Sequence, residues 1–166
     1  VDVIEAGFPS SSEGEKKVVK DIAKMGLNSK ICALSRATKK DVDAALDCNV
    51  DLIHVFIPTS NVQMKYAVNL TPEQVMQSAV ESIEYVKDHG VKCEFSPMDA
   101  TRSDIEFLEK ICIATQNAGA NSINIPDTVG IMIPKTTAKL IEKIKSVVTV
   151  PISIHCHDDF GMAVAN

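Results

Sequence analysis

The sequence has no apolar run long enough to cross a bilayer, no excess of positive charge and no glycine-rich phosphate loop. A membrane protein is excluded because a spanning helix needs ~20 consecutive apolar residues. Seventeen Lys and Arg against 22 Asp and Glu give a net charge of -5, and the lysines are spread along the chain. This argues against a nucleic-acid partner held through its phosphates. No nucleotide loop of the usual glycine spacing is indicated either.

Closely paired cysteines and a signal peptide are also missing. The five cysteines are an odd number, and four of them sit within or beside apolar segments, as buried free thiols do. The first residues, Val-Asp-Val-Ile-Glu-Ala-Gly, carry neither a basic start nor a small-residue cleavage site. These features predict a reducing, cytoplasmic compartment. The first residues read as the middle of a strand, and the last residues read as a helix with no cap or breaker. We therefore expect residues 1–166 to be a piece of a longer domain.

What the sequence does contain is a repeated unit. Short β-branched runs occur at 1–8, 30–36, 52–58, 91–97, 122–126 and 152–157. Segments of helical period lie between them, at 12–26, 39–48, 72–88, 102–118 and 135–147. Strands that alternate with helices predict βα units in a parallel sheet with right-handed crossovers. The predicted class is α/β.

The faces of the predicted strands separate two architectures, the open doubly wound sheet and the closed (β/α)₈ TIM barrel. In the run 52–58, Ile53 and Val55 alternate with His54, and the later runs repeat this pattern of apolar and polar residues. An open sheet covered by helices on both faces favours two apolar faces, whereas a barrel places polar side chains at its interior mouth. A complete barrel needs roughly 250 residues. We therefore predict a partial catalytic TIM-barrel domain over 1–166, with about six βα units and the first and last strands missing.

The triplet His155-Cys156-His157 at the end of a strand is the most informative local pattern. Residues i and i+2 project from one face of a strand, so the two imidazoles can reach one divalent cation. A third ligand, such as a carboxylate, would be required. Asp158 and Asp159 would orient the imidazoles. The alternative interpretation is two histidines that are hydrogen-bonded in a polar core.

Other polar residues share the inward parity of the two histidines: Glu5, His54, Glu94, Ser96, Asn124 and Thr128. A buried polar group costs free energy unless it is paired, bound to a ligand or used in chemistry. Each one alone is equally well explained as a satisfied core residue, but their convergence at one mouth favours a site. A polar turn follows the run 91–97 and contains Asp99, Thr101, Arg102 and Asp104. It indicates either helix capping with a surface arginine or substrate contact.

Several segments together resemble the family of 2-isopropylmalate, homocitrate and citramalate synthases, with the 2-isopropylmalate branch closest. They are Ile4 to Pro9, Ala33 to Arg36, Glu94 to Pro97, Ile125 to Gly130 and His155 to Asn166. The resemblance implies a metal-dependent TIM barrel that condenses acetyl-CoA with a 2-oxo acid and then hydrolyses the thioester. For this branch the 2-oxo acid is 2-oxoisovalerate, in leucine biosynthesis. It further implies a divalent metal (Mn, Mg or Zn) and a homodimer in the full-length form.

The resemblance also implies roles for individual residues. His155 and His157 would bind the metal, and Thr128 would contact the 2-oxo acid as a catalytic residue. Glu5 matches a catalytic carboxylate near the metal. The remaining substrate-binding residues would be Leu34, His54, Ser96, Asn124 and Pro126.

The chain departs from the family pattern in two respects. The family's first strand, with its metal-binding aspartate, would precede Val1, and the late asparagine ligand would follow Asn166. Position 98 carries Met where the family usually has Glu, and a thioether cannot transfer a proton. We therefore expect this piece alone to be inactive. The alternatives are homocitrate or citramalate synthase, a related metal-dependent carbon–carbon lyase, or a barrel remnant that binds without turnover.

Overall fold

A single parallel sheet runs through the whole molecule, and the computed structural model describes all 166 residues. Its six strands lie side by side in chain order. They are β1 (Val3–Gly7), β2 (Lys30–Arg36), β3 (Leu52–Pro58), β4 (Lys92–Met98), β5 (Ser122–Asp127) and β6 (Ile152–Cys156). Every neighbouring pair is parallel. This confirms the predicted repeat of βα units, with strand bounds close to the predicted runs.

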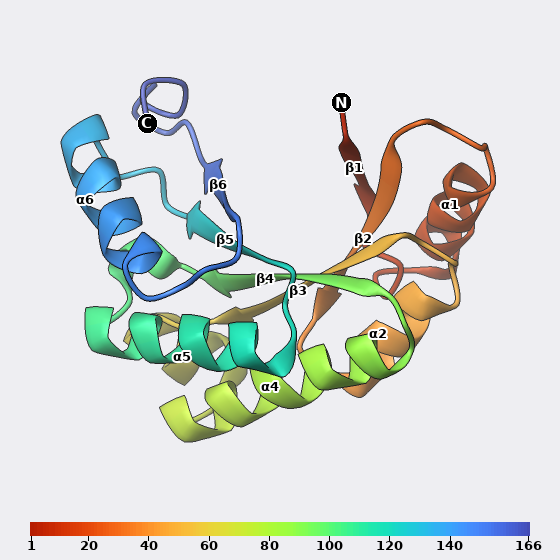
Figure 1. The fold of residues 1–166 in the computed structure, drawn as a ribbon, viewed down its shortest axis with the longest axis horizontal. Coiled ribbons are helices and arrows are strands. Elements are labelled where there is room, and N and C mark those ends of the chain that lie inside the picture. Colours follow the sequence, from red (N-terminus) through yellow and green to blue (C-terminus); the bar gives the residue numbers. More distant parts are fainter.

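The helices cover the outer, convex face of this sheet (Figure 1). The five longer helices are α1 (Glu13–Ala23), α2 (Lys39–Leu46), α4 (Pro72–Asp88), α5 (Ile105–Ala118) and α6 (Pro134–Lys145). The Thr71 and Asp104 side chains cap α4 and α5 by accepting backbone N–H bonds from Gln74 and Phe107. The cap at Asp104 explains why α5 begins later than the predicted segment 102–118.

Three short helical turns were not predicted from the sequence. The turn α3 (Asn61–Gln63) and the π-helical turn η1 (Met64–Val68) follow β3, and the 3₁₀ turn η2 (Ala100–Arg102) follows β4. Turns of this length carry too few residues for a hydrophobic period to be visible. All three lie at the carboxyl ends of strands, where the candidate site is found.

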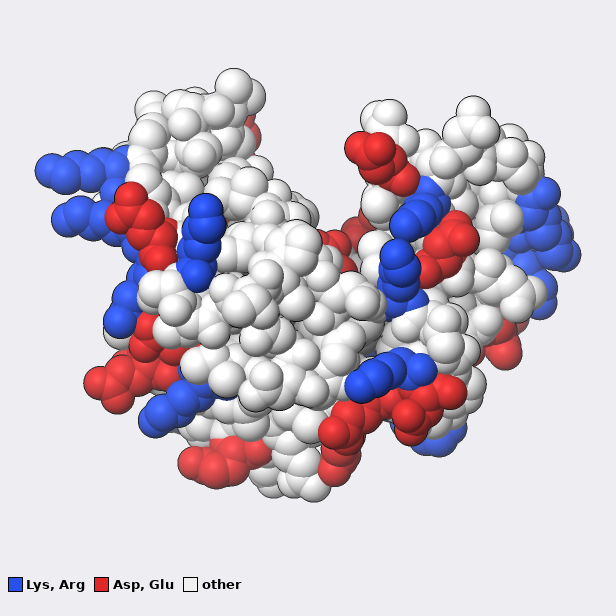
Figure 2. Space-filling model, viewed as in Figure 1, with Lys and Arg blue, Asp and Glu red and all other residues white.

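The sheet curls into an open half-barrel and does not close. The two edge strands, β1 and β6, stand on opposite sides of the opening, and both chain ends lie near it (Figure 1). Figure 2 shows the hollow between these two sides, while Lys and Arg lie mainly on the outer helical surface. The prediction of an incomplete TIM barrel is confirmed.

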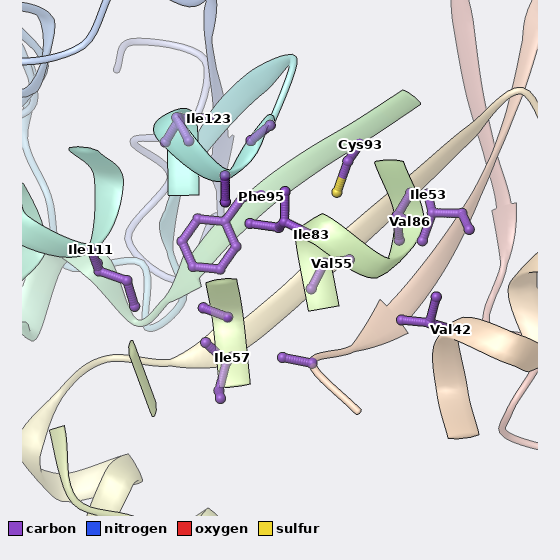
Figure 3. Close-up of a cluster of buried hydrophobic side chains, with 14 of the residues drawn as sticks. Val42, Ile53, Val55, Ile57, Ile83, Val86, Cys93, Phe95, Ile111 and Ile123 are labelled. Carbon is purple, nitrogen blue, oxygen red and sulfur yellow. The ribbon is translucent and has the colours of Figure 1, made fainter. Parts of the chain in front are cut away.

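The hydrophobic core fills the layer between the outer face of the sheet and the helices (Figure 3). Ile53, Val55, Phe95 and Ile123 point outward from β3, β4 and β5 and are fully buried. Ile83 of α4 packs in the same layer. Each such side chain contributes roughly 1.5–3 kcal/mol through burial. The apolar parity identified in the sequence is thus the helix-facing side of the strands.

On strand β6 the apolar, helix-facing side is only partly buried. Ile154 is 46% exposed, although its parity matches the buried Ile123 and Ile125 of β5. A groove remains there between β6 and α6, lined by Ile141, Val148 and Ile152 among others.

The cysteines are all free, and four of the five are buried, as predicted. Burial raises the pKa of the Cys93 and Cys112 thiols to about 12, which keeps both protonated and unreactive. None of the helices has the length and apolar content required to span a membrane.

Candidate active site

The carboxyl ends of the strands surround a cavity of about 210 Å³ at the mouth of the half-barrel. Its walls contain all nine residues predicted from the sequence: Glu5, Leu34, His54, Ser96, Asn124, Pro126, Thr128, His155 and His157. Phe56 and Met98 complete the lining. Side chains from every strand, or from the residue just after it, converge there because inward-facing residues of a curled sheet point toward a common centre. The structure therefore brings the whole predicted set together.

His54 is the centre of a hydrogen-bonded row that crosses three strands. Its Nδ1 lies 2.6 Å from Oε2 of Glu5, and its Nε2 lies 2.7 Å from Oγ of Ser96. The Glu5 carboxylate can only accept when ionised, so Nδ1 carries the hydrogen in that state. In neutral His54, Nε2 then accepts from the Ser96 hydroxyl. This arrangement fixes one imidazole tautomer and can pass a proton between Ser96 and His54.

The row continues deeper into the half-barrel through an amide and a second serine. Asn124 Nδ2 donates to Ser96 Oγ at 2.6 Å, and Asn124 Oδ1 lies 3.0 Å from the Ser153 hydroxyl. The same hydroxyl donates to Oε1 of Glu94 at 2.5 Å. The inward-facing Glu94 is thus a partner of Ser153 and does not line the cavity. These contacts link the polar groups on the inner face of β3, β4, β5 and β6, with the one hydroxyl hydrogen of Ser153 shared between Glu94 Oε1 and Asn124 Oδ1.

Two pKa shifts describe the electrostatics of the mouth. The hydrogen bond from His54 lowers the pKa of Glu5 against the opposing effect of burial, so Glu5 is ionised at neutral pH. Burial, followed by the charge of His157, lowers the pKa of His155. His155 is therefore neutral at pH 7, which is the form in which an imidazole binds a metal.

His155 and His157 lie on the same face at the end of β6. Their rings are stacked, with centroids 5.0 Å apart and planes only 7° from parallel. Both rings line the cavity, as the i, i+2 spacing predicts. No cluster of three or more His, Cys, Asp or Glu side chains in the chain is arranged to hold a metal ion. The two imidazoles suit a pair of ligands to a divalent cation, but they are an incomplete set.

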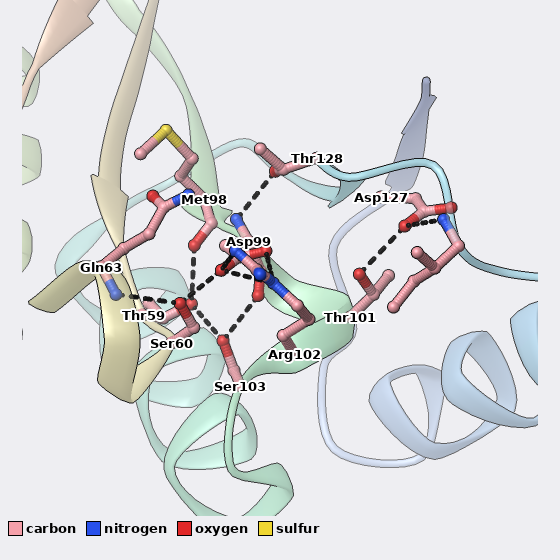
Figure 4. A network of polar contacts seen from close by, with 11 residues as sticks. Thr59, Ser60, Gln63, Met98, Asp99, Thr101, Arg102, Ser103, Asp127 and Thr128 are labelled. Carbon is pink, nitrogen blue, oxygen red and sulfur yellow. Dashed lines mark hydrogen bonds and ion pairs between the residues drawn. The ribbon is translucent and has the colours of Figure 1, made fainter. Parts of the chain in front are cut away.

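Thr128 is held from below by the loop after β4 (Figure 4). The backbone N–H of Asp99 donates to Oγ1 of Thr128 at 2.9 Å. Asp99 is fully buried, and its carboxylate binds the guanidinium of Arg102, with Nη2 at 2.7 Å. The polar turn noted in the sequence contains Asp104, which caps a helix, and Arg102, which is half-exposed. Thr101 donates to the buried carboxylate of Asp127 at 3.0 Å.

One wall of the cavity is apolar and consists of Leu34, Phe56, Met98 and Pro126. Sequence reasoning did not assign a site role to Phe56, although its parity with His54 on β3 already placed it on the inner face. The rings of Phe56 and Phe8 pack in a T-shaped arrangement, with centroids 6.3 Å apart. Met98 stands in this wall at the position where the resemblance predicts a carboxylate.

The chain is similar to known proteins over its whole length. A family model described as HMGL-like matches residues 1–166. A probable 2-isopropylmalate synthase of Methanosarcina mazei is 52% identical over 166 residues, which is 100% of this chain and 32% of that protein. An (R)-citramalate synthase of Methanocaldococcus jannaschii is 46% identical over the same 166 residues, or 34% of its length. The chain thus spans about a third of the length of these curated relatives.

Among solved structures, an HMG-CoA lyase from Bacillus subtilis superposes with a TM-score of 0.85 at 18% identity. The superposition covers 100% of this chain and 59% of that structure. This likeness shows the fold alone, a barrel of which the chain supplies a part. With the family model matched from the first residue to the last, the chain belongs to the HMGL-like family.

Proposed function

We propose that the chain is the central part of an acyltransferase that condenses acetyl-CoA with 2-oxoisovalerate to give 2-isopropylmalate, a step of leucine biosynthesis. The main observation in support of this proposal is that all nine predicted residues line one cavity at the strand ends. The 52% identity to a probable 2-isopropylmalate synthase supports the same assignment.

The lining of the cavity favours a branched apolar 2-oxo acid. None of its eleven lining residues is Lys or Arg, so the part of the pocket that this chain supplies offers no fixed cation for the second carboxylate of 2-oxoglutarate. Leu34, Phe56, Met98 and Pro126 form a surface on which an isopropyl group can be buried. Pyruvate, the substrate of a citramalate synthase, has only a methyl group and would fill less of this wall. These features support 2-oxoisovalerate over the two alternatives.

The polar residues have separate roles in this proposal. Thr128 donates to the 2-oxo acid, while Ser96 and Asn124 fix the inner end of the pocket. Glu5 holds His54 in one tautomer and lies on the side of the cavity facing His155. His155 and His157 would supply two ligands to a divalent cation (Mn, Mg or Zn), which when bound polarises a substrate carbonyl as a Lewis acid. The remaining ligands would come from parts of the barrel outside this chain.

We further infer a cytoplasmic location, because five free thiols suit a reducing compartment. Acetyl-CoA is the inferred co-substrate, and the complete protein is inferred to be a homodimer. Neither a nucleic acid nor a membrane is an expected partner, given the net charge of -5.

The test is a chimera in which this chain replaces the matching segment of the Methanosarcina mazei relative. Thiol release from acetyl-CoA should be fastest with 2-oxoisovalerate, slower with pyruvate and slowest with 2-oxoglutarate. The His157→Ala chimera should lose activity, whereas His89→Ala should retain it, because His89 lies at the exposed C-terminus of α4. A folded chimera that releases no thiol from acetyl-CoA with any of the three acids would contradict the proposal and favour a lyase or a non-catalytic barrel.

A further inference from the structure

Asp99 has a backbone conformation that is unusual for a residue with a side chain. Its φ of 66° and ψ of 34° lie in the left-handed region, which costs free energy in any L-residue. Asp99 is also fully buried, so the carboxylate needs partners. Such a conformation persists only where the surroundings impose it.

The side chain of Asp99 supplies that restraint. Arg102 Nε lies 2.8 Å from Oδ1 and 3.0 Å from Oδ2, and Arg102 Nη2 lies 2.7 Å from Oδ2. The Ser60 hydroxyl, which is also buried, donates a short hydrogen bond to the same carboxylate. Ser60 follows β3, so the anchor ties the loop after β4 to the end of a neighbouring strand (Figure 4). The Asp99 backbone is therefore clamped from two sides.

The clamped backbone determines what the Thr128 hydroxyl can do. A backbone N–H can only donate, so Thr128 Oγ1 must be the acceptor in its 2.9 Å bond to Asp99. The single hydroxyl hydrogen of Thr128 is then left over for another acceptor. Thr128 lines the cavity, and the mouth is where an acceptor oxygen of a ligand would lie.

We propose that Asp99 is a positioning residue, which holds Thr128 so that its hydroxyl donates its hydrogen to a carboxylate or ketone oxygen in the cavity. The identity of that ligand as a 2-oxo acid rests on the proposed function. Asp99 itself does not line the cavity, so it acts only through Thr128. Ser60 and Arg102 support it by fixing its carboxylate.

The first test measures the Asp99 to Thr128 bond in the 166-residue chain without any ligand. In ¹H–¹⁵N NMR spectra, Thr128→Val should move the Asp99 amide proton upfield, because the acceptor is lost, whereas Thr128→Ser should leave it nearly unchanged. Asp99→Asn should retain most of the amide position, because asparagine tolerates the left-handed region and still offers an acceptor to Ser60. An Asp99 amide that is unchanged in Thr128→Val would overturn the proposal.

The second test is a double-mutant cycle on the binding of 2-oxoisovalerate to the chimera, followed by titration calorimetry. Asp99→Ala should weaken binding about tenfold in the wild-type background, the effect of losing one hydrogen bond to a charged ligand. On the Thr128→Val background it should cause little further loss. Losses that multiply would mean that Asp99 only stabilises the fold, and would overturn the proposal.

Asp41→Ala is the matched control for this cycle. Asp41 is a second buried aspartate that is also held by one arginine, Arg36, and one serine, Ser10, but it does not line the cavity. Asp41→Ala should lower the melting temperature without moving the amide of residue 99 or the affinity. A wild-type chimera that binds none of 2-oxoisovalerate, pyruvate and 2-oxoglutarate would contradict the proposed function, whereas the amide measurement on the 166-residue chain still decides whether Asp99 holds Thr128.

Discussion

The imidazole of His54 and the carboxylate of Glu5 form a hydrogen bond of 2.6 Å although their strands are not neighbours. Glu5 lies on β1 and His54 on β3, with β2 between them. In a flat sheet, next-nearest strands are roughly 9–10 Å apart. The inward curl of the half-barrel brings the two side chains together. Their hydrogen bond is therefore a consequence of the curvature of the sheet.

The Glu5 to His54 pair should make stability depend on pH. The hydrogen bond from His54 lowers the native pKa of Glu5 below the ordinary value of a Glu carboxyl. Glu5 therefore stabilises the fold above that ordinary pKa, and the contribution is lost as the pH falls through the native pKa. Glu5 is 44% exposed, so the contribution should be at most about 1 kcal/mol. Urea unfolding of wild type and Glu5→Gln should differ at pH 7 and converge as the pH falls below the native pKa of Glu5. The exposed Glu84→Gln should show no such pattern, and a constant difference for Glu5→Gln would contradict the assignment.

Metal binding by the chain alone should be weak. Two imidazoles are present at the mouth, but no third His, Cys, Asp or Glu completes a cluster. Calorimetry with Mn²⁺ or Zn²⁺ should give no tight site, and any weak binding should be reduced in His155→Ala. His89→Ala is the control, since His89 lies on the outer surface at the end of α4. A single tight site that survives His155→Ala would show that the metal binds elsewhere.

Met98→Glu should raise turnover in the chimera. The backbone at position 98 is fixed independently of the side chain, because the Met98 carbonyl accepts bonds from the N–H and the hydroxyl of Thr59. The new carboxylate would therefore enter the cavity without altering the strand. General acid–base groups typically contribute ~10²–10⁴-fold to rate. Met98→Gln has the same size without a carboxylate and should not raise the rate. If both variants behave alike, proton transfer is handled by other residues.

The isolated chain should associate through its open side. The backbone edges of β1 and β6 are unpaired, and Ile4 and Ile154 are 37% and 46% exposed. Light scattering at rising concentration should show dimers or larger species, and Ile154→Lys should shift them toward monomer. Val18→Lys changes a similarly exposed apolar residue on α1 and should have little effect. A monomer at all micromolar concentrations would mean that the edges are protected in some other manner.

Much of the fold and most of the site follow from local sequence. The alternation of Ile53 and Val55 with His54 determined both the strand and its two faces, because side chains of a strand point alternately to opposite sides. The spacing of His155 and His157 determined that both rings share one face. All nine predicted residues line one cavity because each was assigned to the inner face or carboxyl end of a strand, and those ends meet at one mouth.

Only the tertiary structure decided which of these residues touch. The left-handed backbone of Asp99 and its bond to Thr128 depend on Ser60 and Arg102, and Ser60 is 39 residues away in the sequence. Likewise, Ile154 has the parity of a buried residue but is exposed, because it borders an open groove between β6 and α6. The alternation of apolar and polar residues indicates only to which face of its own strand a side chain points. The partner that the side chain meets depends on the curvature of the sheet and on contacts between segments far apart in the chain.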